Sequence, residues 1–166
     1  MRTFLALLAG LALTAQAGIT SSYTNTEKDC RFEENDSPEA EGKDLPKDCP
    51  GPGEYHLGES YSALGSSRYI TQGVDGAMTP LSLDPGDCPI AVFGKMLEWR
   101  MRDGSPFAVI QRATCMEPNE TSSGRGRTLG EWIVVRELHG SQRKVEIDAL
   151  RTPKANAKAR DIADKF

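Results

Sequence analysis

Apolar and polar residues alternate most regularly over residues 96–102, and a turn pair, Asp103-Gly104, follows directly. A second apolar run then begins near residue 106. This pattern predicts a β-hairpin formed by residues 96–102 and 106–115. In such a hairpin one face is buried, and apolar side chains meet across the two strands on that face. The expected pairs are Trp99 with Val109 and Met101 with Phe107.

Four further segments have strand character. Residues 132–135 and 145–147 are rich in Val and Ile and flank a turn at Gly140-Ser141, so we expect them to adjoin the hairpin. Shorter stretches at 55–57 and 68–71 also predict strands.

The end of the chain, residues 153–166, has helical periodicity. Thr152 is a candidate cap, and Pro153 suits the first helical position. The inward face is mostly alanine, which lets a helix pack closely on a sheet. We therefore expect an α+β fold, in which an antiparallel sheet of four to six strands carries the C-terminal helix on one face. Residues 96–150 form its strand-rich core.

Composition narrows the class of protein. The chain has 166 residues, of which 38% are apolar and 27% charged, as in an ordinary globular protein. Twenty basic and 24 acidic side chains give a formal net charge of -4. A nucleic-acid partner is not expected, because phosphate neutralisation needs a basic face that this composition does not supply.

Residues 1–17 resemble a secretory signal. Arg2 precedes an apolar run at 4–13, and Ala15-Gln16-Ala17 forms a small-residue exit, so we place cleavage after Ala17. The apolar run would span only about 15 Å as a helix, half of a bilayer's hydrocarbon core. We therefore expect an exported protein, periplasmic or secreted, in which residues 18–166 form one disulfide-stapled domain without a transmembrane anchor.

The chain has four cysteines, an even number that predicts two structural disulfides in an exported protein. No C-x-x-C pair is present, so zinc is not expected, and we expect no cofactor. Three connectivities are possible, and sequence alone does not choose among them. We favour Cys30 with Cys49, because closing the polar loop between them gains about 3 kcal/mol. Cys88 then pairs with Cys115, provided that the chain bends near Pro89 or Gly94.

Residues 27–48 hold nine acidic and four basic side chains, which is typical of a solvated acidic loop. The carboxylates do not follow the alternating pattern of a calcium loop, so calcium is not expected.

Several arginines are candidates for contact with a partner. Arg100 and Arg112 lie on the polar face of the predicted hairpin, where a fixed guanidinium can hold a carboxylate by two hydrogen bonds. Arg125 and Arg127 lie in a long polar loop at 117–130, and loops of this kind are often functional.

Several short segments form a recognisable set: Ser22-Tyr23-Thr24, Cys30, Cys49-Pro50-Gly51 with Gly53, and residues 97–100, 106–110 and 155–164. In these segments the chain resembles a family of small exported bacterial proteins, chiefly proteobacterial and without assigned activity. Lys47-Asp48 stands where the family often has an aromatic residue and Arg, and a later Cys of the family is absent. The resemblance implies export, one disulfide and the fold plan, and it carries no catalytic residue.

A shorter segment, residues 65–69, resembles the Ser/Gly-rich loop, basic residue and Tyr with which periplasmic lysozyme inhibitors enter a cationic enzyme's cleft. In this interpretation Arg68 and Tyr69 contact the partner. The acidity of the chain agrees with a basic partner.

These observations favour a non-enzymatic exported binding module, whose partner is an unidentified protein or envelope component. A periplasmic lysozyme-inhibitor-like protein is the first alternative. A small hydrolase, in which His56 or His139 acts with a carboxylate, is the second. A structural envelope protein is a further possibility that the sequence does not separate from a binding module.

Overall fold

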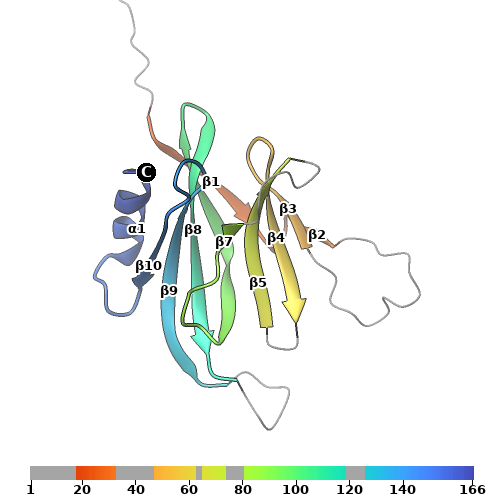
Figure 1. The fold of residues 1–166 in the computed structure, drawn as a ribbon, viewed down its shortest axis with the longest axis vertical. Coiled ribbons are helices and arrows are strands. Elements are labelled where there is room, and N and C mark those ends of the chain that lie inside the picture. The colour runs from red at the N-terminus through yellow and green to blue at the C-terminus, as the bar shows by residue number, and fades with distance from the viewer. Residues whose placement is uncertain (1–17, 33–46, 63–64, 74–80, 119–125) are drawn as a thin grey trace, which may run out of the picture.

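The computed structural model describes residues 18–32, 47–62, 65–73, 81–118 and 126–166, which form two antiparallel sheets and one helix (Figure 1). Sheet A has the strand order β1-β7-β8-β9-β10, and sheet B has the order β2-β3-β4-β5-β6. The strands of sheet A are β1 (Thr20–Asn25), β7 (Ile90–Arg102), β8 (Ser105–Met116), β9 (Thr128–Glu137) and β10 (Lys144–Asp148). Those of sheet B are β2 (Arg31–Phe32), β3 (Lys47–Pro50), β4 (Tyr55–Ser62), β5 (Gly65–Gln72) and β6 (Leu81–Ser82).

Sheet A is the middle of three layers, with sheet B on one face and helix α1 (Ala155–Ala163) on the other. One core cluster joins the sheets and includes Leu57 and Ile70 of sheet B with Leu97 and Trp99 of sheet A. A second cluster lies between sheet A and α1. Sheet A therefore has buried side chains on both of its faces.

The mainly antiparallel architecture and its C-terminal helix are as expected, but the prediction of one sheet was wrong. The second sheet is built from segments whose apolar positions are sparse, such as Cys49, Leu57 and Ile70, all fully buried. The two ends of the predicted acidic loop belong to β2 and β3, and residues 33–46 lie outside the described residues. The predicted strands at 55–57 and 68–71 are confirmed and lie in β4 and β5. The other strands of this sheet gave only a weak pattern, because a sheet with one solvated face needs only every second residue to be apolar.

The hairpin is β7–β8, and Trp99 pairs with Val109 as predicted. Met101 pairs with Pro106 instead of Phe107, because the register shifts between Arg100 and Met101. Proline has no N–H to donate to the ladder and is therefore tolerated at bulges. The shift turns Phe107 toward α1, where it joins the second core cluster.

A second irregularity in β7 brings the later cysteines together. Phe93 pairs with Ala113 and Leu97 with Gln111, so residues 94–96 stand opposite a single residue of β8. Ala91 consequently lies opposite Cys115. This bulge, at the predicted bend near Gly94, shortens the gap that a regular hairpin would leave.

The structure confirms both favoured disulfides. Cys30 is bonded to Cys49 and Cys88 to Cys115, with Cα–Cα distances of 4.0 and 5.3 Å.

Helix α1 packs on sheet A as expected, and Ala155, Ala159 and Ala163 are its buried residues. Its start was predicted two residues too early. Lys154 is the N-cap, in the left-handed region at φ 52° and without a side-chain cap. Thr152 and Pro153 belong to the preceding turn, in which the Thr152 N–H donates to the carbonyl of Asp148.

Candidate functional site

A groove of about 280 Å³ opens on the helix side of sheet A. Helix α1 packs on β8, β9 and β10, so it leaves the β1–β7 edge of this face open. The lining comes from five elements and comprises Tyr23, Gly94, Lys95, Met96, Glu98, Ile110, Arg112, Ile133, Asn156 and Arg160. We call this feature the α1 groove.

The α1 groove has an apolar floor and a partly apolar rim. Ile110 and Ile133 are buried, at 7% and 1% exposure. Tyr23 and Met96 are 50% and 46% exposed, and both belong to the few large apolar side chains that the described residues expose. The groove therefore joins buried aliphatic surface to accessible apolar surface.

Arg160 of α1 crosses toward β7 and is held there by Glu98. Its Nε and Nη2 donate to the two carboxylate oxygens at 2.8 and 3.0 Å, and Nη2 also reaches the Tyr23 hydroxyl at 3.4 Å. Burial alone would raise the pKa of Glu98. Hydrogen bonds from Arg160 and Ser21, with the charges of Arg160 and Arg100, more than offset it and lower that pKa. Glu98 therefore stays ionised and fixes the guanidinium.

Arg112, a predicted contact residue, lies in β8 and reaches the first turn of α1. Its Nη1 donates to Glu131 at 2.7 Å and its Nη2 to the Asn156 side chain at 3.1 Å. Its side chain remains 41% exposed. Lys95, in the bulge, pairs with Glu27 at 2.8 Å and is 68% exposed. The structure thus brings one predicted arginine into the groove.

Arg100 does not reach the groove surface. It is buried, and its Nε and Nη2 each donate at 2.8 Å to the Asp164 carboxylate. A further nitrogen donates to the Ser21 hydroxyl. The expected two-point hold on a carboxylate is present, but the carboxylate belongs to the C-terminal end of this chain. The contact of Arg100 with a partner stays a prediction, and the carboxylate that Arg100 holds in this structure is that of Asp164.

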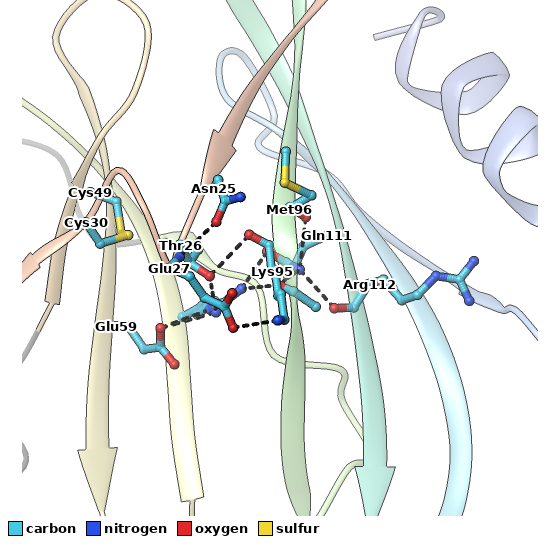
Figure 2. A network of polar contacts seen from close by, with 12 residues as sticks. Asn25, Thr26, Glu27, Cys30, Cys49, Glu59, Lys95, Met96, Gln111 and Arg112 are labelled. Atoms are coloured by element: carbon cyan, nitrogen blue, oxygen red, sulfur yellow. Dashed lines mark hydrogen bonds and ion pairs between the residues drawn. A yellow bond between two sulfur atoms is a disulfide. The ribbon is translucent and has the colours of Figure 1, made fainter.

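Arg68 is also buried, at 4% exposure, and lies in strand β5 instead of a loop. It pairs with Glu59 at 3.2 Å and donates to the Gly94 carbonyl, Gln111 and Thr26. Its partners Glu59, Gln111 and Thr26 are labelled in Figure 2. Residues 65–69 were expected to resemble a loop, and this was wrong, because they belong to β5. The lysozyme-inhibitor alternative itself stays a prediction.

Tyr69 lies in the same strand and is half-buried. Its ring occupies the space above Gly58, where an added Cβ would come within 2.3 Å of Cε2. Arg127 is exposed and makes two hydrogen bonds to Glu117, at 2.7 and 3.2 Å. That pairing lowers the pKa of Glu117 and raises the pKa of Arg127. Arg125 lies outside the described residues.

The two histidines occupy different environments. His56 contacts the Asp48 carboxylate through Nδ1 at 3.1 Å and is partly exposed. His139 contacts the Tyr55 hydroxyl at 3.2 Å and the Pro106 carbonyl at 3.2 Å. Burial raises the pKa of Tyr55. The part of the chain that the structure describes contains no group of three or more His, Cys, Asp or Glu able to hold a metal ion.

Most groove residues were missed from the sequence. Asn156 and Arg160 are four residues apart on the helix, and this spacing places them on one face. The sequence therefore contained this spacing, but polar residues at such positions are also typical of the solvent-exposed face of a helix. Tyr23 and Met96 gave no signal, because β1 pairs with β7 across more than 70 residues of sequence.

No protein-family model, curated protein or solved structure matches this chain. The resemblance to exported proteobacterial proteins therefore stays a prediction.

Proposed function

We propose that this protein is an exported, non-enzymatic binding module that holds a protein or envelope partner through the α1 groove. The observation that carries the proposal is the combination, in one groove, of accessible Tyr23 and Met96 with two arginines already fixed by neighbours. Aromatic residues, Met and Arg are the side chains enriched at protein interfaces.

Fixed arginines favour binding for an entropic reason. Ordering a long side chain at an interface costs about 0.5–1.5 kcal/mol. Glu98 already restrains Arg160, while Glu131 and Asn156 restrain Arg112. A partner that contacts these groups meets donors whose positions are largely set.

Two observations agree with export to the periplasm or beyond. Both disulfides are of the kind that forms in oxidising compartments. Among the described residues, no helix has the length and apolarity needed to cross a bilayer. Together with the leader-like residues 1–17, they support an exported binding protein.

The test is retention of envelope components by the immobilised mature chain. Arg112→Gln with Met96→Glu alters the groove at two exposed positions, and Arg127→Gln alters an exposed arginine elsewhere as the matched control. We expect one component to be retained by the wild type and the control and lost by the groove variant. No retention at micromolar bait, or retention that the groove variant leaves unchanged, contradicts the proposal.

A hydrolase is the second candidate, favoured by the contact between His56 and Asp48. A carboxylate that orients a histidine is part of many general-base arrangements. The discriminating variants are His56→Ala and Asp48→Asn, assayed on ester and peptide substrates. A hydrolytic activity that both substitutions abolish would replace the binding proposal with this one.

A further inference from the structure

The floor of the α1 groove fits one aliphatic side chain. The volume of the whole groove, about 280 Å³, lies just below the roughly 300–1,000 Å³ of sites that enclose a whole drug-sized ligand. Ile110 and Ile133 supply branched aliphatic surface beneath it. A site of this size takes one end of a larger molecule.

Two guanidinium nitrogens at the groove have hydrogen-bonding capacity left. Arg112 Nε and Arg160 Nη1 have no acceptor among the described residues, whereas the other nitrogens of both groups are engaged. Asn156 binds Arg112 and lies one helical turn before Arg160, so both guanidinium groups border the helix side of the groove. Guanidinium groups that are already oriented recognise planar carboxylates well.

Recognition at the groove depends on short-range hydrogen bonds. The three cationic side chains of the lining, Lys95, Arg112 and Arg160, are each paired with a carboxylate, of Glu27, Glu131 and Glu98, so the local charge is balanced. A free amino acid would bring an ammonium group toward guanidinium groups, which have donors and no acceptor to offer it. The last residue of a peptide has a neutral amide at that position.

We propose that the α1 groove receives the C-terminal residue of a partner polypeptide. Its aliphatic side chain lies on Ile110 and Ile133, and its α-carboxylate accepts hydrogen bonds from Arg112 and Arg160. The residues before it lie along Tyr23 and Met96, whose exposed surface extends the apolar floor. An internal Asp or Glu has no branched aliphatic side chain on the carbon that bears its carboxylate, and a short fatty acid makes no contact beyond the floor. This inference rests on the proposed binding function.

The experiment is an NMR titration of the ¹⁵N-labelled mature protein with acetyl-Ala-Ala-Leu. We expect shifts at Gly94, Met96 and Arg112, with saturation below about 1 mM. Three further probes identify the source of the carboxylate: the same peptide amidated at its C-terminus, free leucine, and 4-methylvaleric acid. Each should bind at least tenfold more weakly than the free-carboxylate peptide. The amidated peptide lacks the carboxylate, free leucine has an ammonium group in place of the neutral amide, and 4-methylvaleric acid lacks the preceding residues.

Substitutions distinguish the binding of the α-carboxylate from the binding of the rest of the peptide. Arg112→Gln should weaken the free-carboxylate peptide roughly tenfold and leave the amidated peptide unchanged. Arg127→Gln should change neither, and the dispersion of each spectrum shows whether the variant is folded. The proposal is overturned by equal affinity for the amidated peptide, by equal affinity for 4-methylvaleric acid, or by an absence of groove shifts. If a retained envelope partner still depends on the groove in that case, only the chain-end inference fails and the proposed function stands.

Discussion

At the scale of single residues, Trp99 organises the contact between the two sheets. It is fully buried, its Nε1–H donates to the Thr24 hydroxyl at 2.9 Å, and the Tyr55 ring lies 6.2 Å away. Gly51 lies directly against the indole, because a Cβ there would be 2.5 Å from Cζ2 and 2.8 Å from the Tyr55 carbonyl oxygen. A buried indole has little room to move, so this glycine is required by contact and not by its backbone angles.

We therefore expect Gly51→Ala to destabilise the protein by about 1–3 kcal/mol, the usual cost of overpacking. Urea unfolding followed by tryptophan fluorescence measures the change. Gly86→Ala is the matched control, because a Cβ there meets Glu146 only at 3.6 Å, an ordinary contact. Equal stability of the two variants would contradict this prediction, because it would mean that the residues around Trp99 rearrange at little cost in free energy.

Glu137 is the residue whose ionisation should matter most for acid stability. Hydrogen bonds from the Arg143 side chain and backbone and from Ser141, with the Arg143 charge, lower the pKa of Glu137 from 4.5 to about 2 despite its burial. A lowered carboxyl pKa stabilises the folded state above pH 4.5, and this contribution is lost as the pH falls from 4.5 toward 2.

We expect Glu137→Gln to be less stable than the wild type above pH 4.5, and the difference to close as the pH approaches 2. Unfolding free energies measured across this range test the prediction. The exposed Glu54, changed to Gln, is the control. A difference that is independent of pH would mean that the carboxyl group acts by shape alone.

At the scale of elements, helix α1 depends on polar contacts at its end. Its buried face is three alanines, which bury little apolar area each. The bidentate hold of Arg100 on Asp164, and the Arg143 guanidinium 4.5 Å from the Phe166 ring centroid, attach the residues that follow the helix. The C-terminal Phe thus has a role that the sequence pattern left unexplained.

Asp164→Asn should therefore loosen the helix selectively. Removing one partner of a buried ion pair costs about 3–5 kcal/mol, and we expect about 2 kcal/mol here because the Asp164 side chain is 30% exposed. Hydrogen exchange should show faster exchange in α1 than in β8. Asp161→Asn, at an exposed position of the same helix, is the control. Uniformly faster exchange in both elements would contradict a local effect.

At the scale of the whole molecule, the two sheets are joined by an apolar core and by one buried polar network. Arg68 and Glu59, both in sheet B, are 4% and 6% exposed. Arg68 reaches across to Gln111 and the Gly94 carbonyl of sheet A, and Figure 2 shows Glu59, Thr26 and Gln111 around this network. The network also fixes the bulge that forms one wall of the α1 groove.

Glu59→Gln should cost about 3–5 kcal/mol, because it removes one partner of a buried ion pair. The double variant Glu59→Gln with Arg68→Met should recover part of that loss, since it removes both charges of the pair. Thermal unfolding of both variants measures this. A double variant less stable than Glu59→Gln would show that the hydrogen bonds to sheet A matter more than the charge.

The disulfides act on the same scale. Closing loops of 19 and 27 residues contributes about 3 kcal/mol each in the chain-entropy estimate. We expect the protein, isolated from its native compartment, to present no titratable thiol, and the double variant Cys88→Ser with Cys115→Ser to lose about 3 kcal/mol of stability. Reaction of four cysteines with a thiol reagent before reduction would contradict both the pairing and export.

Sequence patterns located the hairpin, the adjoining strands, the helix and the favoured cysteine pairs. They also located two strands of sheet B, at 55–57 and 68–71, but did not show that these belong to a second sheet, because strand pairing joins residues far apart in the chain. The pairing of Met101 with Phe107 was wrong, because the register of the hairpin shifts next to Pro106. Arg100 and Arg68 looked like surface charges, since burial of an arginine depends on a carboxylate that the fold supplies from elsewhere. Of the predicted contact arginines that the structure describes, only Arg112 lines the α1 groove.

The sequence by itself determined the elements whose stabilising contacts join residues close together in the chain. Apolar–polar alternation, turn residues and helical spacing are properties of consecutive residues, and the even number of cysteines indicated two disulfides. The α1 groove was decided by the tertiary structure alone. It forms because β1 pairs with β7 and the helix covers only part of sheet A, and those contacts join residues that are far apart in the chain.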